Sequence, residues 1–185
     1  MNNKLADTNS GNENCTITMH INIEWPSILK YWFGKARRAQ RVERVSIRNI
    51  IQRQDDESDW LIAVLVMDNA SVDENNPEYL DLTQLRLCLT SSGTFFPWTC
   101  SCGAPGCAGM FQGVAVSHTE INTTWLDLDG NRKLEFSTSM LRSAFDDAII
   151  NGSRILATEP GLEVTPNQNA VEFQTSNEIT KEAFL

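Results

Sequence analysis

Several short stretches of this chain alternate apolar and polar residues, a pattern that predicts β-strands. Residues 16–24 place every second side chain, from Ile17 to Ile23, on one apolar face, which is typical of a half-buried strand. The continuous apolar run at residues 60–67 has the length of a strand and predicts a central strand covered on both faces. Further strands are predicted over residues 45–52, 80–89, 114–118, 123–127 and 133–136.

A helical period occurs in two places. Pro26 suits the start of a short helix, because apolar residues recur at helical spacing from Ile28 to Ala36. Residues 137–150 carry the clearest helical stripe, and Gly152 is a plausible stop for that helix. Between residues 127 and 133 the pair Asp-Gly predicts a tight hairpin turn, since it tolerates positive φ angles.

Together these elements predict an α+β fold: one antiparallel sheet of six or seven strands with two helices. The polar residues 1–14 predict a disordered N-terminus. Residues 15–156 then form a single domain. Residues 157–185 are polar and interrupted by proline, which predicts a flexible C-terminal tail with at most one edge strand, near residues 171–173.

The balance of charge narrows the class of function. The net charge of −9 over 185 residues argues against broad non-specific binding to nucleic acid, which needs a basic surface. Eight of the fifteen basic residues nevertheless lie between Lys30 and Arg53, which leaves the rest more acidic. No apolar run is long enough for a membrane span, and the polar start lacks the core of a signal peptide, so we expect a cytoplasmic protein.

Three cysteines, Cys100, Cys102 and Cys107, crowd into eight residues. An odd total of five cysteines, clustered in this way, fits metal chelation better than a framework of disulfides. Gly103, Pro105 and Gly106 supply the sharp turn that three converging thiolates require. The spacing therefore predicts a zinc site, which adds a zinc-stabilised loop to the α+β fold, with free thiols or a Cys100–Cys107 disulfide as the alternatives.

The fourth ligand of such a site stays open at this stage. His118 is the first candidate, because a hairpin could return it to the cysteines. Cys88, at the end of a predicted strand, is the second candidate. Water is the third, and it would leave a Lewis-acid position instead of a closed structural site.

The string from Cys100 to Gly109, followed by residues 114–118 and Trp125, resembles a segment of uncharacterised bacterial proteins that share a Cys-x-Cys-Gly-x-x-Gly-Cys-x-Gly knuckle. The resemblance covers residues 98–125 and implies no activity. The knuckle is also similar to the SWIM zinc finger, which follows C-x-C with C-x-H and is associated with nucleic acid. Here Gly109 stands where that pattern has histidine.

Patterns typical of enzymes are incomplete. His118-Thr-Glu120 matches the H-x-E element of zinc deaminases, but in those enzymes the histidine precedes the cysteines. The string from Asp127 to Asn131 departs from a calcium loop in the place of its glycine, so a hairpin turn explains it better. Neither a nucleophile elbow nor a phosphate-binding loop is present.

The sequence therefore predicts a small acidic zinc protein that works by binding, as an inhibitor or immunity protein against a basic toxin or nuclease. The expected binding surface is the acidic loop that contains Asp68, Asp73, Glu74 and Glu78. Two other classes stay open. One is a zinc-dependent enzyme with an open metal site near the cysteines and Glu120, and the other is a nucleic-acid accessory factor that uses the strip from Lys30 to Arg53.

Overall fold

The computed structural model describes residues 38–53, 58–68, 70 and 78–174. These residues belong to one compact unit, Ala36–Leu185. The strand predicted at residues 16–24, the helix predicted after Pro26 and the disordered start predicted at residues 1–14 lie outside the described residues. Among the described helices, none combines the length and apolar character that a membrane crossing requires.

The architecture is α+β, but the strands that the structure describes form three sheets and not the single antiparallel sheet expected from the sequence. The first sheet has the order β1-β9-β8-β7-β5 and the second has the order β10-β3-β2. The third contains only β4 and β6. Two pairings, β1 with β9 and β10 with β3, are parallel. Alternation reveals where strands occur, but it does not reveal their partners.

The strand bounds among the described residues are β1 Gln40–Arg41, β2 Val45–Gln52, β3 Trp60–Met67, β4 Tyr79–Leu80, β5 Gly93–Phe95, β6 Trp98–Thr99, β7 Val114–His118, β8 Asn122–Asp127, β9 Arg132–Ser137 and β10 Glu163–Thr165. The helices are α2 Leu82–Thr90, the short 3-10 helix η1 Pro105–Ala108 and α3 Thr138–Thr158. Residues 169–174 are also helical. The strands predicted at residues 45–52, 60–67 and 114–118 are confirmed, as is the hairpin of β8 and β9.

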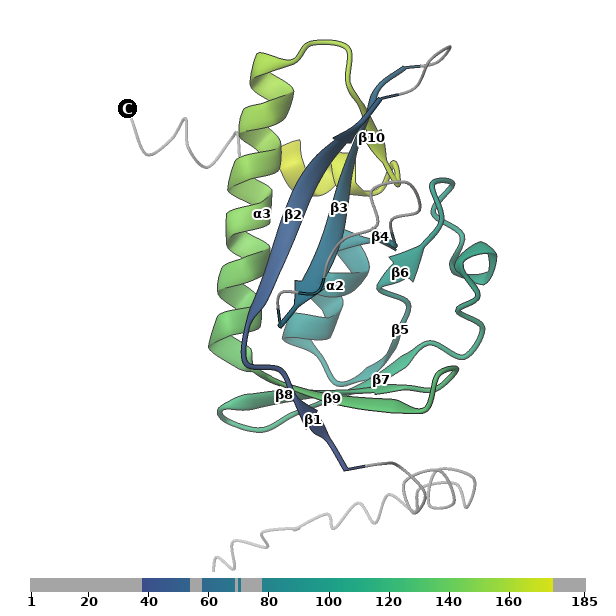
Figure 1. The fold of residues 1–185 in the computed structure, drawn as a ribbon, viewed down its shortest axis with the longest axis vertical. Helices are drawn as coiled ribbons and strands as arrows, with labels where there is room; N and C mark the ends of the chain where they lie inside the picture. Colours follow the sequence, from purple (N-terminus) through teal and green to yellow (C-terminus); the bar gives the residue numbers. More distant parts are fainter. Residues whose placement is uncertain (1–37, 54–57, 69, 71–77, 175–185) are drawn as a thin grey trace, which may run out of the picture. The chain divides into compact units, whose positions relative to one another are not determined.

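Helix α3 begins directly after β9 and lies along β2, as Figure 1 shows. Leu141, Ala144 and Phe145 on its buried side join one core with Ile47 of β2 and Ala63 of β3. The helix is longer than predicted, because it continues through Gly152. A Cβ atom at Gly152 would overlap the ring of Phe173, so this glycine permits close packing within the helix instead of ending it.

The strand predicted at residues 80–89 is wrong, because most of this segment forms α2. Asp81 caps the helix, its carboxylate accepting a hydrogen bond from the backbone N–H of Gln84 at 2.9 Å. Leu82, Leu85 and Leu89 then fall on one buried side. The alternating leucines fitted a strand equally well, and only the cap distinguishes the two.

The C-terminal region up to residue 174 is packed, in contrast to the flexible tail predicted from residue 157. Strand β10 pairs in parallel with β3, and Phe173 lies in the core with 1% of its surface exposed. Asn169 bridges to the start of α2, accepting from Leu82 N at 2.7 Å and donating to Leu80 O at 2.9 Å. The edge strand expected near residues 171–173 is helical instead.

Candidate metal centre

The cysteine-bearing segment leaves β6 at Thr99 and makes a compact turn built from backbone hydrogen bonds. Gly103 N–H donates to Cys100 O at 2.9 Å, and Cys107 N–H donates to Ala104 O at 3.2 Å. Gly103 and Gly109 both adopt left-handed φ angles, of 81° and 77°. Of the residues predicted to make this turn, Gly103 has a left-handed φ angle and Pro105 begins η1, but the second left-handed glycine is Gly109 and not Gly106.

This turn gathers the three cysteines. The sulfur atoms of Cys100, Cys102 and Cys107 all lie within 4.8 Å of one another, close enough to bind a metal ion. The Sγ atoms of Cys100 and Cys102 are 2.7 Å apart. Around a tetrahedral zinc ion, thiolates are about 3.8 Å apart, so shifts of about 1 Å would suit the sulfurs to zinc. All three thiols are free.

The electrostatics of the turn favour a thiolate at Cys100. A hydrogen bond from the Cys102 thiol lowers the pKa of Cys100 from 9.0 to about 7, assisted by the backbone N–H groups of Ala104 and Cys102. The pKa of Cys107 is raised, because its thiol donates to Cys100 and Cys102. One thiolate shared among neighbouring thiols is the form in which such a cluster meets a metal cation.

The structure does not bring His118 to the cysteines. Strand β7 begins after the cysteine turn at Val114, which pairs with Asp127. His118 lies four residues further along the strand and pairs with Thr123. At about 3.3 Å per residue, this separation is about 13 Å. The ring nitrogens of His118 contact Thr123 Oγ1 at 3.0 Å and Ser91 O at 3.1 Å, so the side chain connects the end of α2 to β8.

Cys88 and Glu120 are also apart from the cluster. Cys88 is fully buried in α2, and burial raises the pKa of its thiol to about 12, which keeps it protonated. Glu120 follows β7 at the same far end as His118. Among the residues that the structure describes, only Cys100, Cys102 and Cys107 form a group of three or more metal-ligating side chains.

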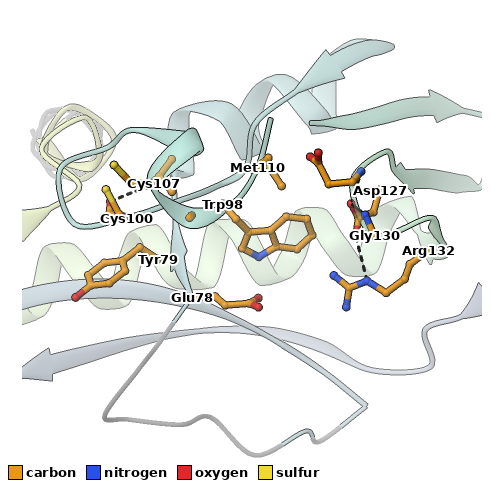
Figure 2. Close-up of a pocket in the computed structure, with 13 residues that line it drawn as sticks. Glu78, Tyr79, Trp98, Cys100, Cys107, Met110, Asp127, Gly130 and Arg132 are labelled. Carbon is orange, nitrogen blue, oxygen red and sulfur yellow. Dashed lines mark hydrogen bonds and ion pairs between the residues drawn. The ribbon is translucent and has the colours of Figure 1, made fainter. Parts of the chain in front are cut away.

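A pocket of about 460 Å³ adjoins the cysteine turn. Figure 2 shows Cys100 and Cys107 at one end, Asp127 and Arg132 at the other, and Trp98 between them. Glu78, Tyr79, Met110 and Asp129 also line it. Sequence reasoning missed this pocket, because its walls come from separate segments, within residues 78–79, 98–100, 107–110 and 127–132, that only the fold brings together.

The far wall of the pocket is the turn between β8 and β9, whose carboxylates accept hydrogen bonds from backbone N–H groups. Asp127 accepts from Asp129 N at 3.1 Å and Gly130 N at 2.8 Å, and it pairs with Arg132 Nε at 3.1 Å. Asp129 accepts from the backbone N–H groups of residues 111–113 at 3.0–3.2 Å. The hairpin is confirmed, although the positive φ angle falls on Asn131 and not on Gly130.

The expected partner surface is divided by the structure. Asp68 accepts hydrogen bonds from the backbone N–H groups of Glu43 and Arg44 at 2.8 and 3.0 Å. Its side chain therefore connects the end of β3 to the residues that precede β2. Glu78 lines the pocket instead. Asp73 and Glu74 lie outside the described residues.

The basic strip is also described only in part, from residue 38 onward. Arg41 pairs with Glu43 at 3.5 Å, and Arg53 pairs with Asp59. Arg48 is exposed on β2. At least two of the basic side chains of this strip are therefore already engaged by neighbouring carboxylates.

Comparison of the chain with models of known protein families, with curated proteins and with solved structures finds no match.

Proposed function

We propose that this chain is a zinc-binding protein that acts by binding a basic protein partner at the pocket beside its cysteine turn. The observation that carries the proposal is the position of Cys100 and Cys107, which belong to the three-sulfur cluster and also line the pocket. A metal held by these sulfurs would fix one wall of the binding site. The role of the ion would be structural.

Zinc is the metal that the donor set favours most. Three thiolates select a soft or borderline cation over magnesium or calcium, which prefer oxygen ligands. The turn also needs support, since no side chain of η1 is buried and no side chain caps its start. Metal binding would supply the stability that the missing core does not.

The charge of the pocket supports a basic partner. Three carboxylates, from Glu78, Asp127 and Asp129, face a single guanidinium, from Arg132, which is already paired with Asp127. Acidic surface attracts basic partners and increases the rate of encounter. An inhibitor or immunity protein that neutralises a basic toxin or nuclease would use such a surface, which here includes Glu78 of the residues first expected to bind the partner.

The test combines metal analysis with capture of the partner. Purified protein should carry about one zinc per chain, and the zinc should be lost from a Cys102→Ser variant. The whole chain, used as bait in a lysate of its host, should capture a basic protein that high salt releases. Glu78→Lys should slow this association, whereas the charge change Glu120→Lys, away from the pocket, should not.

Two results would count against the proposal. Protein that contains no metal after purification without chelator would remove the zinc site. A captured partner that is acidic, and that is lost on replacement of Arg41 and Arg48, would assign recognition to the basic strip instead.

A further inference from the structure

We infer that the fourth ligand of the metal is a neutral nitrogen donor of the imidazole type, which reaches the ion through the pocket. This inference rests on the zinc site proposed above. It adds the class of ligand that the pocket selects, and it assigns the pocket beside the cysteines the role of admitting that ligand.

The first step is the supply of ligands. Zinc takes four ligands in a tetrahedral arrangement. Within the described part of the chain, the cysteine cluster includes three sulfur atoms and no histidine or carboxylate. His118 is held by Thr123 and Ser91, while Asp127 and Asp129 already accept backbone N–H groups. The described residues therefore leave one coordination position to a ligand from outside.

The second step is access. Cys100 and Cys107 line the pocket, whereas Cys102 does not, so an ion bound to the three sulfurs borders the pocket on the side of these two residues. The volume of about 460 Å³ is large enough for a small heterocycle or for an amino-acid side chain. Tyr79, Trp98 and Met110 offer apolar surface to the body of such a ligand.

The third step is charge, which decides the class of ligand. Zinc with three thiolates carries one net negative charge, and the pocket adds three carboxylates against one guanidinium. An anionic donor such as a thiolate, a carboxylate or hydroxide would be repelled there. A neutral imidazole avoids this repulsion and is a common zinc ligand. Its nitrogen lone pair replaces that of a bound water, so the charge of the centre is unchanged.

The experiment uses cobalt(II) in place of zinc in the full chain, because its visible spectrum reports the ligands of a tetrahedral site. Three probes carry the same donor with different charge: histamine is cationic, imidazole is neutral and imidazole-4-acetate is anionic. Titration at about pH 8 keeps the imidazole rings neutral. We expect the spectrum to shift with all three, with affinity falling by about three- to tenfold from histamine to imidazole and again to the acetate.

Glu78→Gln tests the origin of this order. It removes one carboxylate from the pocket and should reduce the preference for histamine over the acetate by about threefold. Glu120→Gln removes the same charge at the far end of β7, and it should leave the preference unchanged. Equal changes in the two variants would overturn the assignment of the selectivity to the pocket.

The outcomes separate the inference from the function on which it rests. A chain that binds no cobalt through sulfur, judged by the absence of thiolate charge-transfer absorption, removes the metal site itself. A chain that binds cobalt but shows no response to any probe retains the metal site and overturns the open position. Cys15 and His20 are the cysteine and the histidine that lie outside the described residues. A spectrum that changes in Cys15→Ser or His20→Ala, without any response to the probes, would assign the fourth ligand to the chain.

Discussion

Two turns face each other across the pocket, and they are held in opposite ways. The turn between β8 and β9 is built on Asp127 and Asp129, whose carboxylates accept hydrogen bonds from backbone N–H groups of five different residues. The turn from Cys100 to Cys107 has backbone hydrogen bonds of its own, but its functional side chains contact chiefly each other. The carboxylates of the first turn have their hydrogen-bond partners within the chain, whereas the sulfurs of the second turn lie close enough to one another to bind a metal ion.

The difference shows how a loop without a hydrophobic core can be held in one conformation. A carboxylate can organise a turn on its own, because the protein supplies the N–H groups that it needs. The three thiols hydrogen-bond chiefly to one another, with additional support for the Cys100 thiolate from the backbone N–H groups of Ala104 and Cys102. Asp129 also holds residues 111–113, where the chain leaves the cysteine turn. The carboxylate turn thus anchors one end of the cysteine turn.

The largest expected effect is on metal affinity. Cys102→Ser removes one of three thiolates. Replacing a residue that only supports a metal ligand lowers metal affinity by about 10–100-fold, so the loss of a ligand itself should lower zinc affinity by more than that. Competition with a coloured zinc chelator measures this loss. In the presence of excess EDTA, the free energy of unfolding should change by less than about 0.5 kcal/mol, because Cys102 is an exposed side chain.

Cys88→Ala is the matched control for this change. It removes a buried thiol from α2 and should cost about 1 kcal/mol of stability while zinc affinity remains unchanged. If both variants lost metal affinity and stability together, the cysteine turn would be part of the core, and the contrast between the two regions would fail.

The carboxylate turn should lose stability without any dependence on metal. Asp127→Ala leaves the N–H groups of Asp129 and Gly130 without their acceptor and should cost about 1–3 kcal/mol, measured by urea denaturation. The cost should be the same with and without EDTA. Asp147→Ala, on the exposed side of α3, should change stability by less than about 0.5 kcal/mol.

The thiols of the metal-free protein should differ in their response to pH. Because the folded-state pKa of Cys100 lies at about 7, below its ordinary 9.0, its thiolate supports the folded turn above pH 9, and this support is lost as the pH falls through about 7. Cys107 has a raised pKa and behaves in the opposite sense, as its support is present at low pH and is lost as the pH rises.

Alkylation with iodoacetamide and mass spectrometry measure this difference. At about pH 7.5, Cys100 should react roughly tenfold faster than Cys107, since only thiolates are nucleophilic. Added zinc should protect both residues. Equal rates for the two cysteines in the metal-free protein would contradict the unequal sharing of charge.

The smallest effect concerns the glycines of the cysteine turn. Gly103→Ala should weaken zinc binding by a few-fold, because φ is 81° there and a new Cβ atom would meet the side chain of Gln168. Gly109→Ala has similar backbone strain, at 77°, but meets no neighbour. Isothermal titration should therefore give a lower zinc affinity for Gly103→Ala than for Gly109→Ala. The reverse order would show that the side chain of Gln168 does not constrain the turn.

The sequence predicted the elements with self-contained signals. The bounds of β2, β3 and β7 follow from short-range periodicity, and the hairpin of β8 and β9 follows from Asp129-Gly130. Helix α2 was missed, although Asp81 followed by Gln84 three positions later is a capping signal before an apolar run. The alternation of leucines was given more weight than this cap.

Features that depend on distant partners were beyond the sequence. The three residues of β10 carry no distinctive period, and they form a strand because β3 offers its edge. The cysteines were found by their spacing, which is a local property. The choice of His118 failed because its position depends on the direction of β7, which carries it away from the turn.

The packing of residues 163–174 has a consequence for the order in which the nascent chain can fold. Strand β3 is complete at Met67, but the partner on one of its edges, β10, emerges from the ribosome about one hundred residues later. At about 5–20 residues per second, β3 waits on the order of ten seconds with that edge unpaired. During this interval Phe173 is also missing from its place against Gly152. An unpaired strand edge is a place where another chain can pair, so β3 is open to edge-to-edge aggregation until β10 has been made.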